Sequence, residues 1–135
     1  MPLRIIPDVV QDQAIHSLRA SSTAQEAARE MIENDVSAVV VVDEHDMLVG
    51  IVTERDMTRR VVAECRDADT VTLNEIMTPT PETLSPDDLA HEALGRMLQR
   101  GFRHLPVLED GRVVGVVSMR NLQRAMATYS AKLGF

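Results

Sequence analysis

The chain has 135 residues, 44% of them hydrophobic and 26% charged, which is the composition of a globular domain long enough to bury a core. Its net charge of −7 and its three aromatic residues argue against nucleic-acid binding, which depends on cationic contacts and stacking surfaces. No apolar run approaches the ~18 residues of a membrane span, no signal-peptide pattern is present and only one cysteine occurs, so we expect a cytoplasmic protein without membrane contact.

The first copy of a repeated pattern begins with a short extended segment at residues 15–18, followed by a helix that Ser22 or Thr23 is able to cap. Two apolar runs flank a polar turn in residues 39–52, which predicts a hairpin, and its valine content predicts strands covered on both faces. A second helix is expected at about residues 54–65. The inward face predicted for the first helix carries Ala24, Ala27, Ala28, Met31 and Ile32.

The second copy starts with an extended segment at residues 82–84. A helix is expected to begin at Ser85, with Pro86 in its first turn, where a missing N–H is tolerated. A second hairpin at residues 105–117 and a helix at 119–129 complete the copy. The inward face predicted for its first helix carries Leu89, Ala93, Leu94, Met97 and Leu98.

The two copies align in register. Residues 17–42 match 83–108 at an offset of 66, and after one missing turn residue the offset becomes 65. Such sustained similarity indicates an internal duplication. The matched pairs are Leu18 with Leu84, Ala24 with Ala90, Glu26 with Glu92, Ala27 with Ala93, Met31 with Met97, Val41 with Val107, Gly50 with Gly115, Val52 with Val117, Arg55 with Arg120 and Arg59 with Arg124.

This pattern predicts the α/β (α+β) class, with two β-α-β-β-α units packed about a pseudo-twofold axis. A single unit of roughly 55–60 residues would bury too little surface to be stable alone. Residues 66–82 are polar and proline-rich, with Leu73, Ile76 and Met77 as apolar anchors. The boundaries we expect are an N-terminal arm at 1–14, a first unit at 15–65, a linker at 66–82, a second unit at 83–129 and a tail at 130–135.

These features resemble the cystathionine-β-synthase (CBS) domain family, in which two CBS domains in tandem form a Bateman module. The resemblance covers residues 15–128 and includes Met31 and Met97 near the ends of the first helices. It rests further on three stretches: VVVVDEHDMLVGIVTERDM (39–57), VTLNEIMTPTPETLSPDDL (71–89) and RHLPVLEDGRVVGVVSMRNL (103–122).

The resemblance implies a regulatory module that binds an adenosine-containing molecule (AMP, ADP, ATP, NAD or S-adenosylmethionine) in the cleft between the paired units. In such modules a threonine or serine contacts the phosphate or ribose, and an aspartate binds the ribose hydroxyls. By position these residues are Thr53 and Asp56 in the first unit and Ser118 and Asn121 in the second. The resemblance also implies a homodimer that signals to an effector protein in trans.

Two physical arguments agree with a ligand at these motifs. A carboxylate accepts hydrogen bonds from both hydroxyls of a vicinal diol, and a helix start offers free N–H groups to a phosphate. Asn121 lacks the charge of Asp56, so we expect weaker ribose recognition in the second unit. The alternative is that Thr53-x-x-Asp56 is a capping box, which needs no ligand.

Basic residues near the motifs are further candidates. Arg103 and His104 precede a strand of the second unit where the first unit is uncharged, so a basic spot is expected from one unit only; the alternative is a solvated loop pair. Arg55 and Arg120 lie inside the motifs and either contact phosphate or pair with surface acids. Solvated helix faces are the simplest interpretation of Arg59, Arg60 and Arg124.

We expect no metal site and no catalytic cofactor. The histidines are scattered, and the acidic turn at residues 43–46 is too short for a calcium loop. Cys65 follows Met57 and Val61 at helical spacing, which predicts burial. No P-loop, GxGxxG, HExxH or nucleophile–base set occurs, so we predict a ligand sensor and not an enzyme. The alternative is a ligand-free protein-interaction scaffold.

Overall fold

The computed structural model describes residues 2–134, and the chain divides into two compact units. We call residues 16–81 the first-repeat unit, and residues 2–15 together with 82–134 the second-repeat unit. The N-terminal residues therefore belong to the unit that contains the second copy of the repeat, although the first copy follows them directly in sequence.

The first-repeat unit is built on a four-stranded sheet in the order β1-β2-β3-β4. β1 (Ser17–Leu18) runs parallel to β2 (Ala38–Val42), which pairs antiparallel with β3 (Leu48–Thr53). β3 in turn pairs antiparallel with β4 (Thr78–Pro79). All five residues of β2 are buried, which confirms the expectation of a strand covered on both faces.

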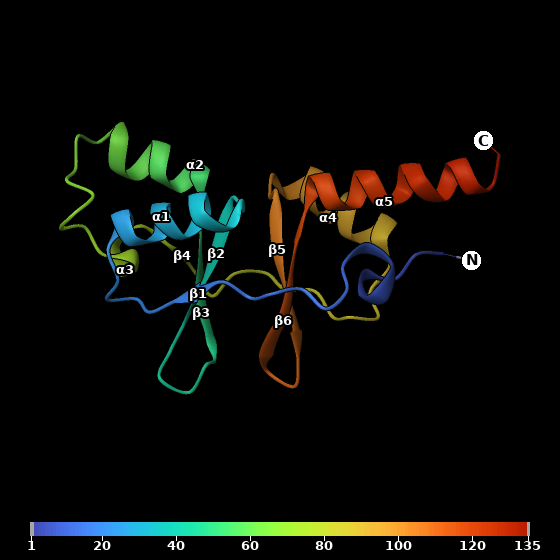
Figure 1. The fold of residues 1–135 in the computed structure, drawn as a ribbon, viewed down its shortest axis with the longest axis horizontal. Coiled ribbons are helices and arrows are strands. Elements are labelled where there is room, and N and C mark those ends of the chain that lie inside the picture. The colour runs from blue at the N-terminus through green and yellow to red at the C-terminus, as the bar shows by residue number, and fades with distance from the viewer. Residues whose placement is uncertain (1, 135) are drawn as a thin grey trace. The chain divides into compact units, whose positions relative to one another are not determined.

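The two helices predicted for the first copy are present in the predicted order, and α1 contacts α2 (Figure 1). The short helix α3 lies in the linker, where no helix was predicted. The Thr23 hydroxyl accepts a hydrogen bond of 3.2 Å from the backbone N–H of Glu26, so Thr23 is the residue that caps the first helix. The second helix is formed by two consecutive segments. The segments are α1 (Ala24–Asn34), α2 (Glu54–Met57), η2 (Thr58–Val62) and α3 (Leu73–Ile76).

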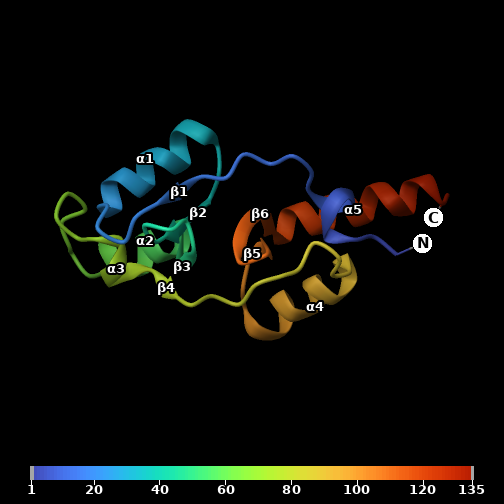
Figure 2. The same ribbon diagram turned by 90° about the horizontal axis from the view of Figure 1, so that it is seen from below.

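The second-repeat unit contains the antiparallel hairpin of β5 (His104–Glu109) and β6 (Arg112–Ser118). Leu84 adds a parallel bridge to Val107, as β1 does to β2 in the other unit. The α5 helix contacts both α4 and the helical turn η1 (Figure 2). These helical segments are η1 (Ile5–Val9), α4 (Ala90–Arg100) and α5 (Met119–Lys132).

The N-terminal arm, residues 2–15, is an integral part of the second-repeat unit. Ile5 is fully buried, and its backbone N–H donates a hydrogen bond of 2.9 Å to the carbonyl of Asp88. The Gln13 side chain binds both backbone groups of Val116, accepting from its N–H at 2.8 Å and donating to its carbonyl at 3.1 Å. A glutamine thus takes the place of an additional strand beside β6.

The linker occupies the corresponding place in the first-repeat unit. When the offset of 66 is extended towards the N-terminus, residues 73–79 match residues 7–13 of the arm. The linker forms both α3 and β4, and its anchors Leu73 and Ile76 are fully buried, as predicted. Each copy of the repeat is therefore completed by the segment that precedes the other copy.

Each unit has its own hydrophobic core. Small alanines on the first helix of each copy allow it to pack closely against the hairpin, and a methionine fills the space at the far end of that helix. The first core contains Ala24, Ala27, Met31, Val39, Val41, Val52, Val61, Val71, Leu73 and Ile76. The second contains Ile5, Leu84, Ala90, Ala93, Met97, Leu105, Val107, Val117 and Leu122.

The predicted start of the second copy's first helix was wrong. α4 begins after Leu89, not at Ser85. Residues 85–88 instead form a turn, in which the Ser85 N–H donates to the Asp88 carboxylate at 2.8 Å. The reason is the arm: the Ala90 N–H bonds to the carbonyl of Leu3, and the carbonyls of residues 86 and 88 accept from the arm, so this segment cannot be helical.

Three side chains that were predicted to be buried are exposed in the structure. Ile32 is 80% exposed and Leu98 is 65% exposed, at equivalent positions of α1 and α4. Both lie on the edge of the helical apolar stripe, beyond the reach of the hairpin in their own unit. Cys65 is also exposed, because the helix ends before it and its backbone turns into the left-handed region at φ 56°.

Candidate ligand site

The start of α2 places Thr53 and Asp56 against each other. Thr53 is the last residue of β3, and its backbone N–H donates to Asp56 Oδ2 at 2.9 Å. The Thr53 hydroxyl lies 3.3 Å from the backbone N–H of Asp56 and accepts from it, which completes a capping box. The capping interpretation is thus confirmed as the local geometry of this motif.

The capping box leaves part of the Asp56 carboxylate available. Oδ2 is engaged by Thr53, but no donor among residues 2–134 lies within hydrogen-bond distance of Oδ1. The side chain is only 14% exposed, so this oxygen is held in a fixed position at the surface of the unit. A fixed carboxylate oxygen is a suitable acceptor for the hydroxyl of a ligand.

Arg60 of η2 is exposed, as the solvated face predicted, but it also makes contacts that were not predicted. Its guanidinium donates to the carbonyl of Ile76 at 2.9 Å and to that of Met77 at 3.2 Å. Its Nε lies 3.9 Å from Asp56 Oδ1, which is a distant ion pair. Arg60 therefore connects the candidate carboxylate with the C-terminal end of α3.

The start of α5 has the same geometry in the second-repeat unit. The Ser118 N–H donates to Asn121 Oδ1 at 2.9 Å, and the Ser118 hydroxyl accepts from the Asn121 N–H at 3.0 Å. An asparagine thus supports the capping box as well as an aspartate does. The difference between Asn121 and Asp56 is the negative charge, and not the local fold.

The structure brings Arg103 and His104 to the same end of the second-repeat unit as Ser118. His104 pairs directly with Ser118 across the hairpin, and the Arg103 carbonyl accepts a hydrogen bond of 2.9 Å from the N–H of Met119. In the first-repeat unit, Ala38 pairs with Thr53 in the same way. The basic residues predicted for one unit only therefore stand beside its helix start.

Arg55 and Arg120 both occupy exposed positions in the first turn of their helices. Within residues 2–134, no carboxylate lies within 4 Å of either guanidinium, so the predicted alternative of a surface ion pair is not formed there. Both side chains stand beside the capping residues and have their cationic ends in solvent.

The acidic turn at residues 43–46 is a hairpin turn. Asp43 Oδ1 accepts hydrogen bonds from the N–H groups of His45 at 2.8 Å and Met47 at 3.1 Å. These two hydrogen bonds lower the pKa of the Asp43 carboxyl, and the bond from Met47 has the larger effect. In the described part of the chain, no group of three His, Cys, Asp or Glu side chains could hold a metal ion.

Comparison with known proteins identifies the family. The CBS domain model matches residues 6–63 and 73–128, that is, most of the chain in two consecutive copies. The chain belongs to the CBS domain family. It is a tandem CBS domain pair, and such pairs are regulatory modules.

A curated relative from Acidianus ambivalens, an uncharacterized 17.7 kDa protein, is 37% identical over 113 residues, which make up 83% of this chain and 67% of the relative. Other curated relatives are longer: the chain spans 53% of a Methanopyrus kandleri protein and 18% of an Arabidopsis thaliana CBS domain-containing protein.

Solved structures show the same fold. A protein with CBS domains from Burkholderia ambifaria superposes with a TM-score of 0.87 at 28% identity, covering 93% of this chain and 95% of that one. The CBS domain pair of protein MJ0100, in complex with 5′-methylthioadenosine and S-adenosyl-L-methionine, gives 0.84 at 25% identity, covering 96% and 99%. That relative binds adenosine-containing molecules.

The sequence predictions left out two features of the structure, the capping box at α3 and the contact of Gln13 with β6. The capping box of Thr72 and Glu75 at α3 follows the same Thr-x-x-acid pattern as Thr53 and Asp56, and it could have been found in that way. Gln13 had no such signal, because one glutamine in a polar arm does not show which strand it binds.

No helix in the described part of the chain is long and apolar enough to cross a membrane.

Proposed function

We propose that this CBS pair is a sensor for an adenosine-containing ligand, with Thr53 and Asp56 as its principal binding residues. The observation that carries the proposal is Oδ1 of Asp56, which accepts no hydrogen bond from residues 2–134 and lies 3.9 Å from Arg60 Nε, while the capping box holds the carboxylate through Oδ2. A ribose offers two adjacent hydroxyls as donors, and charge-assisted hydrogen bonds to a carboxylate are the stronger kind. The ligands of the MJ0100 pair support this chemical class.

The phosphate or other anionic part of such a ligand would be met by Arg55, beside the positive end of the helix. In the second-repeat unit the corresponding group is Ser118, Asn121 and Arg120, with Arg103 and His104 beside it. Because Asn121 is uncharged, ribose binding there is weaker, and its basic residues favour a ligand with more negative charge.

Assembly is the second part of the proposal. Ile32, Val62 and Leu98 are large apolar side chains exposed by 65% or more on the helices of the two units. Such residues are often covered by another protein surface. We infer that the chain forms a homodimer through these helices and passes its signal to an effector protein.

Isothermal titration calorimetry with AMP, ADP, ATP, NAD and S-adenosylmethionine tests the ligand class. Binding of at least one of them with micromolar affinity, reduced about tenfold or more in Asp56→Ala, is the expected result, since one charge-assisted contact contributes about 1.5–3 kcal/mol. Native mass spectrometry of the purified protein reports the subunit count and any retained nucleotide. No binding of any compound, together with a co-purifying protein, would favour the scaffold function instead.

A further inference from the structure

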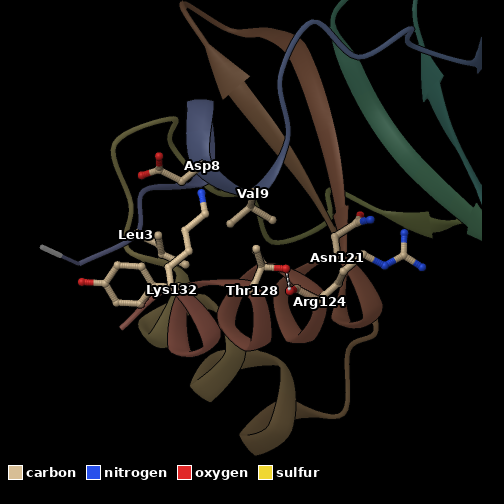
Figure 3. Close-up of a pocket in the computed structure, with 9 residues that line it drawn as sticks. Leu3, Asp8, Val9, Asn121, Arg124, Thr128 and Lys132 are labelled. Atoms are coloured by element: carbon tan, nitrogen blue, oxygen red, sulfur yellow. Dashed lines mark hydrogen bonds between the residues drawn. The ribbon is translucent and has the colours of Figure 1, made fainter. Parts of the chain in front are cut away.

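A pocket of about 330 Å³ lies between the N-terminal arm and α5, entirely within the second-repeat unit (Figure 3). Leu3, Asp8 and Val9 of the arm line it together with the face of α5 that extends from Asn121 to Lys132. Volumes of about 300–1,000 Å³ are typical of small-molecule sites. The pocket touches the start of α5 only at Asn121 and otherwise follows the helix towards its C-terminus.

One difference between the repeats lies at this pocket. At the offset of 65, Ala125 of α5 corresponds to Arg60 of the first-repeat unit. There the Arg60 side chain reaches from its helix to the end of α3 and donates to the carbonyls of Ile76 and Met77. In the second-repeat unit the equivalent arm segment faces an alanine, so the corresponding region is open.

The charges around the pocket favour an anionic occupant. Arg124 and Lys132 line it with two cationic groups, and Asp8 supplies one negative group, whose Oδ2 already accepts a hydrogen bond of 2.8 Å from the N–H of Arg4. Within residues 2–134, no carboxylate lies within 4 Å of Arg124 or Lys132. Figure 3 shows Lys132 reaching from the end of α5 towards the arm and Arg124 at the opposite end of the pocket, beside Asn121.

We propose that this pocket is a separate binding site for a small organic anion bearing phosphate or carboxylate groups, with Arg124 and Lys132 as its two cationic contacts. The helix rise of about 1.5 Å per residue separates these side chains by about 12 Å along α5. A molecule with negative charge at more than one position therefore fits better than a single small ion. The site is distinct from the helix start at Thr53 and Asp56, which lies in the other unit, and it shares only Asn121 with the helix start of its own unit.

Titration of the ¹⁵N-labelled protein with inorganic pyrophosphate and, separately, with citrate tests the site by amide chemical shifts. We expect saturable changes confined to the arm at residues 3–9 and to α5 at residues 121–132 with at least one of the two probes. The probe that binds more tightly identifies phosphate or carboxylate as the preferred chemistry. No saturable change with either probe overturns the proposal.

Two kinds of variant separate pocket binding from general attraction to positive charge. Arg124→Gln and Lys132→Gln are each expected to weaken binding about tenfold, whereas Arg59→Gln, the equivalent arginine of the first-repeat unit, leaves it unchanged. Ala125→Arg restores the side chain found in the other repeat and adds a cation. It is expected to abolish binding by filling the pocket.

Tighter binding in Ala125→Arg, or equal weakening by Arg59→Gln and Arg124→Gln, would show non-specific attraction and overturn the proposal. The glutamine variants lie on the exposed face of α5, so they remain informative if Ala125→Arg does not fold. The test is independent of the nucleotide sensor, because Asp56→Ala is expected to leave the pyrophosphate and citrate titrations unchanged.

Discussion

The Arg60 guanidinium donates a hydrogen bond of 2.9 Å to the carbonyl of Ile76. Through this contact, and a second one to Met77, the helical segment that follows Thr53 is attached to the linker segment that completes the first-repeat unit. The same arginine lies 3.9 Å from Asp56 Oδ1. A ligand at Asp56 would therefore act directly next to a contact that holds the linker in place.

Replacement of Arg60 is expected to destabilise the protein. Arg60→Gln loses two hydrogen bonds that the guanidinium donates, and one of the accepting carbonyls belongs to Ile76, which is fully buried. The free energy of unfolding should therefore fall by about 1–3 kcal/mol. Urea denaturation measures this change. Arg59→Gln is the control, since Arg59 is exposed, and its effect should stay within about 0.5 kcal/mol. Equal effects of the two variants would show that the contacts of Arg60 contribute nothing.

Glycine is required at position 50 for close packing of the linker against β3. A Cβ atom on Gly50 would clash with Met77 Sδ and lie 3.1 Å from the Thr78 carbonyl oxygen, so Gly50→Ala must move the Met77 side chain and press on the backbone of β4. We expect a loss of about 1–3 kcal/mol in stability, seen as a lower melting temperature.

Gly95 in the middle of α4 provides the matched comparison. A Cβ there would meet nothing within 4 Å, and alanine favours helix over glycine by about 0.5–1 kcal/mol. Gly95→Ala should therefore raise the melting temperature while Gly50→Ala lowers it. Shifts in the same direction would contradict the packing described for Gly50.

Gln13 should slow hydrogen exchange at the edge of β6, because its side chain binds the backbone of Val116. Gln13→Ala removes both hydrogen bonds to Val116 and leaves its backbone groups without a protein partner, which is expected to cost about 1–3 kcal/mol. Hydrogen exchange followed by NMR should show faster exchange of the Val116 amide. Gln11→Ala changes an exposed side chain of the same arm and serves as the control. Unchanged protection of Val116 would show that the arm is not held at this position.

Stability in acid should depend on Glu82. The hydrogen bond from Arg96 lowers the pKa of the Glu82 carboxyl most, and the bond from Arg100 lowers it further. Partial burial raises this pKa, but by less than the two arginines lower it. The pKa of Glu82 in the folded protein is thus below the ordinary value of 4.5. The ionised Glu82 therefore stabilises the folded state fully at pH values above 4.5, and this stabilisation is lost as the pH falls through the folded pKa.

Denaturation of the wild type and Glu82→Gln over a pH series measures this effect. The wild type should be the more stable at pH 7, and the difference should disappear in acid. Glu92→Gln, at an exposed position of α4, should show little difference at any pH. A difference between the wild type and Glu82→Gln that stays constant down to pH 3 would show that the ion pairs with Arg96 and Arg100 do not contribute.

Much of the fold could be predicted because each copy carries strong local patterns. The valine runs, the turn between them and the Thr-x-x-acid motifs specify hairpins and helix starts through nearest neighbours alone. The duplication supported these assignments independently, since the same elements recur at an offset of 66 and then 65, although the helix predicted to begin at Ser85 starts after Leu89.

The features that could not be predicted depend on contacts between distant segments. The arm packs on the second copy through backbone bonds and Gln13, which leave no pattern in the sequence. Those bonds also move the start of α4 from Ser85 to Leu89. Likewise, helical periodicity places Ile32 and Leu98 on an apolar stripe, but the hairpin is too narrow to cover the edge of that stripe.

Calorimetric titration of Asp56→Asn with the nucleotide that binds the wild type tests the central claim most directly. Asn121 shows that an asparagine preserves the capping box, so this variant removes the charge of the carboxylate without disturbing the helix start. We predict an unchanged melting temperature and an affinity reduced about tenfold or more, because an uncharged amide replaces a charge-assisted acceptor. Equal affinities of the two proteins would contradict a ligand role for Asp56 and leave it as a capping residue.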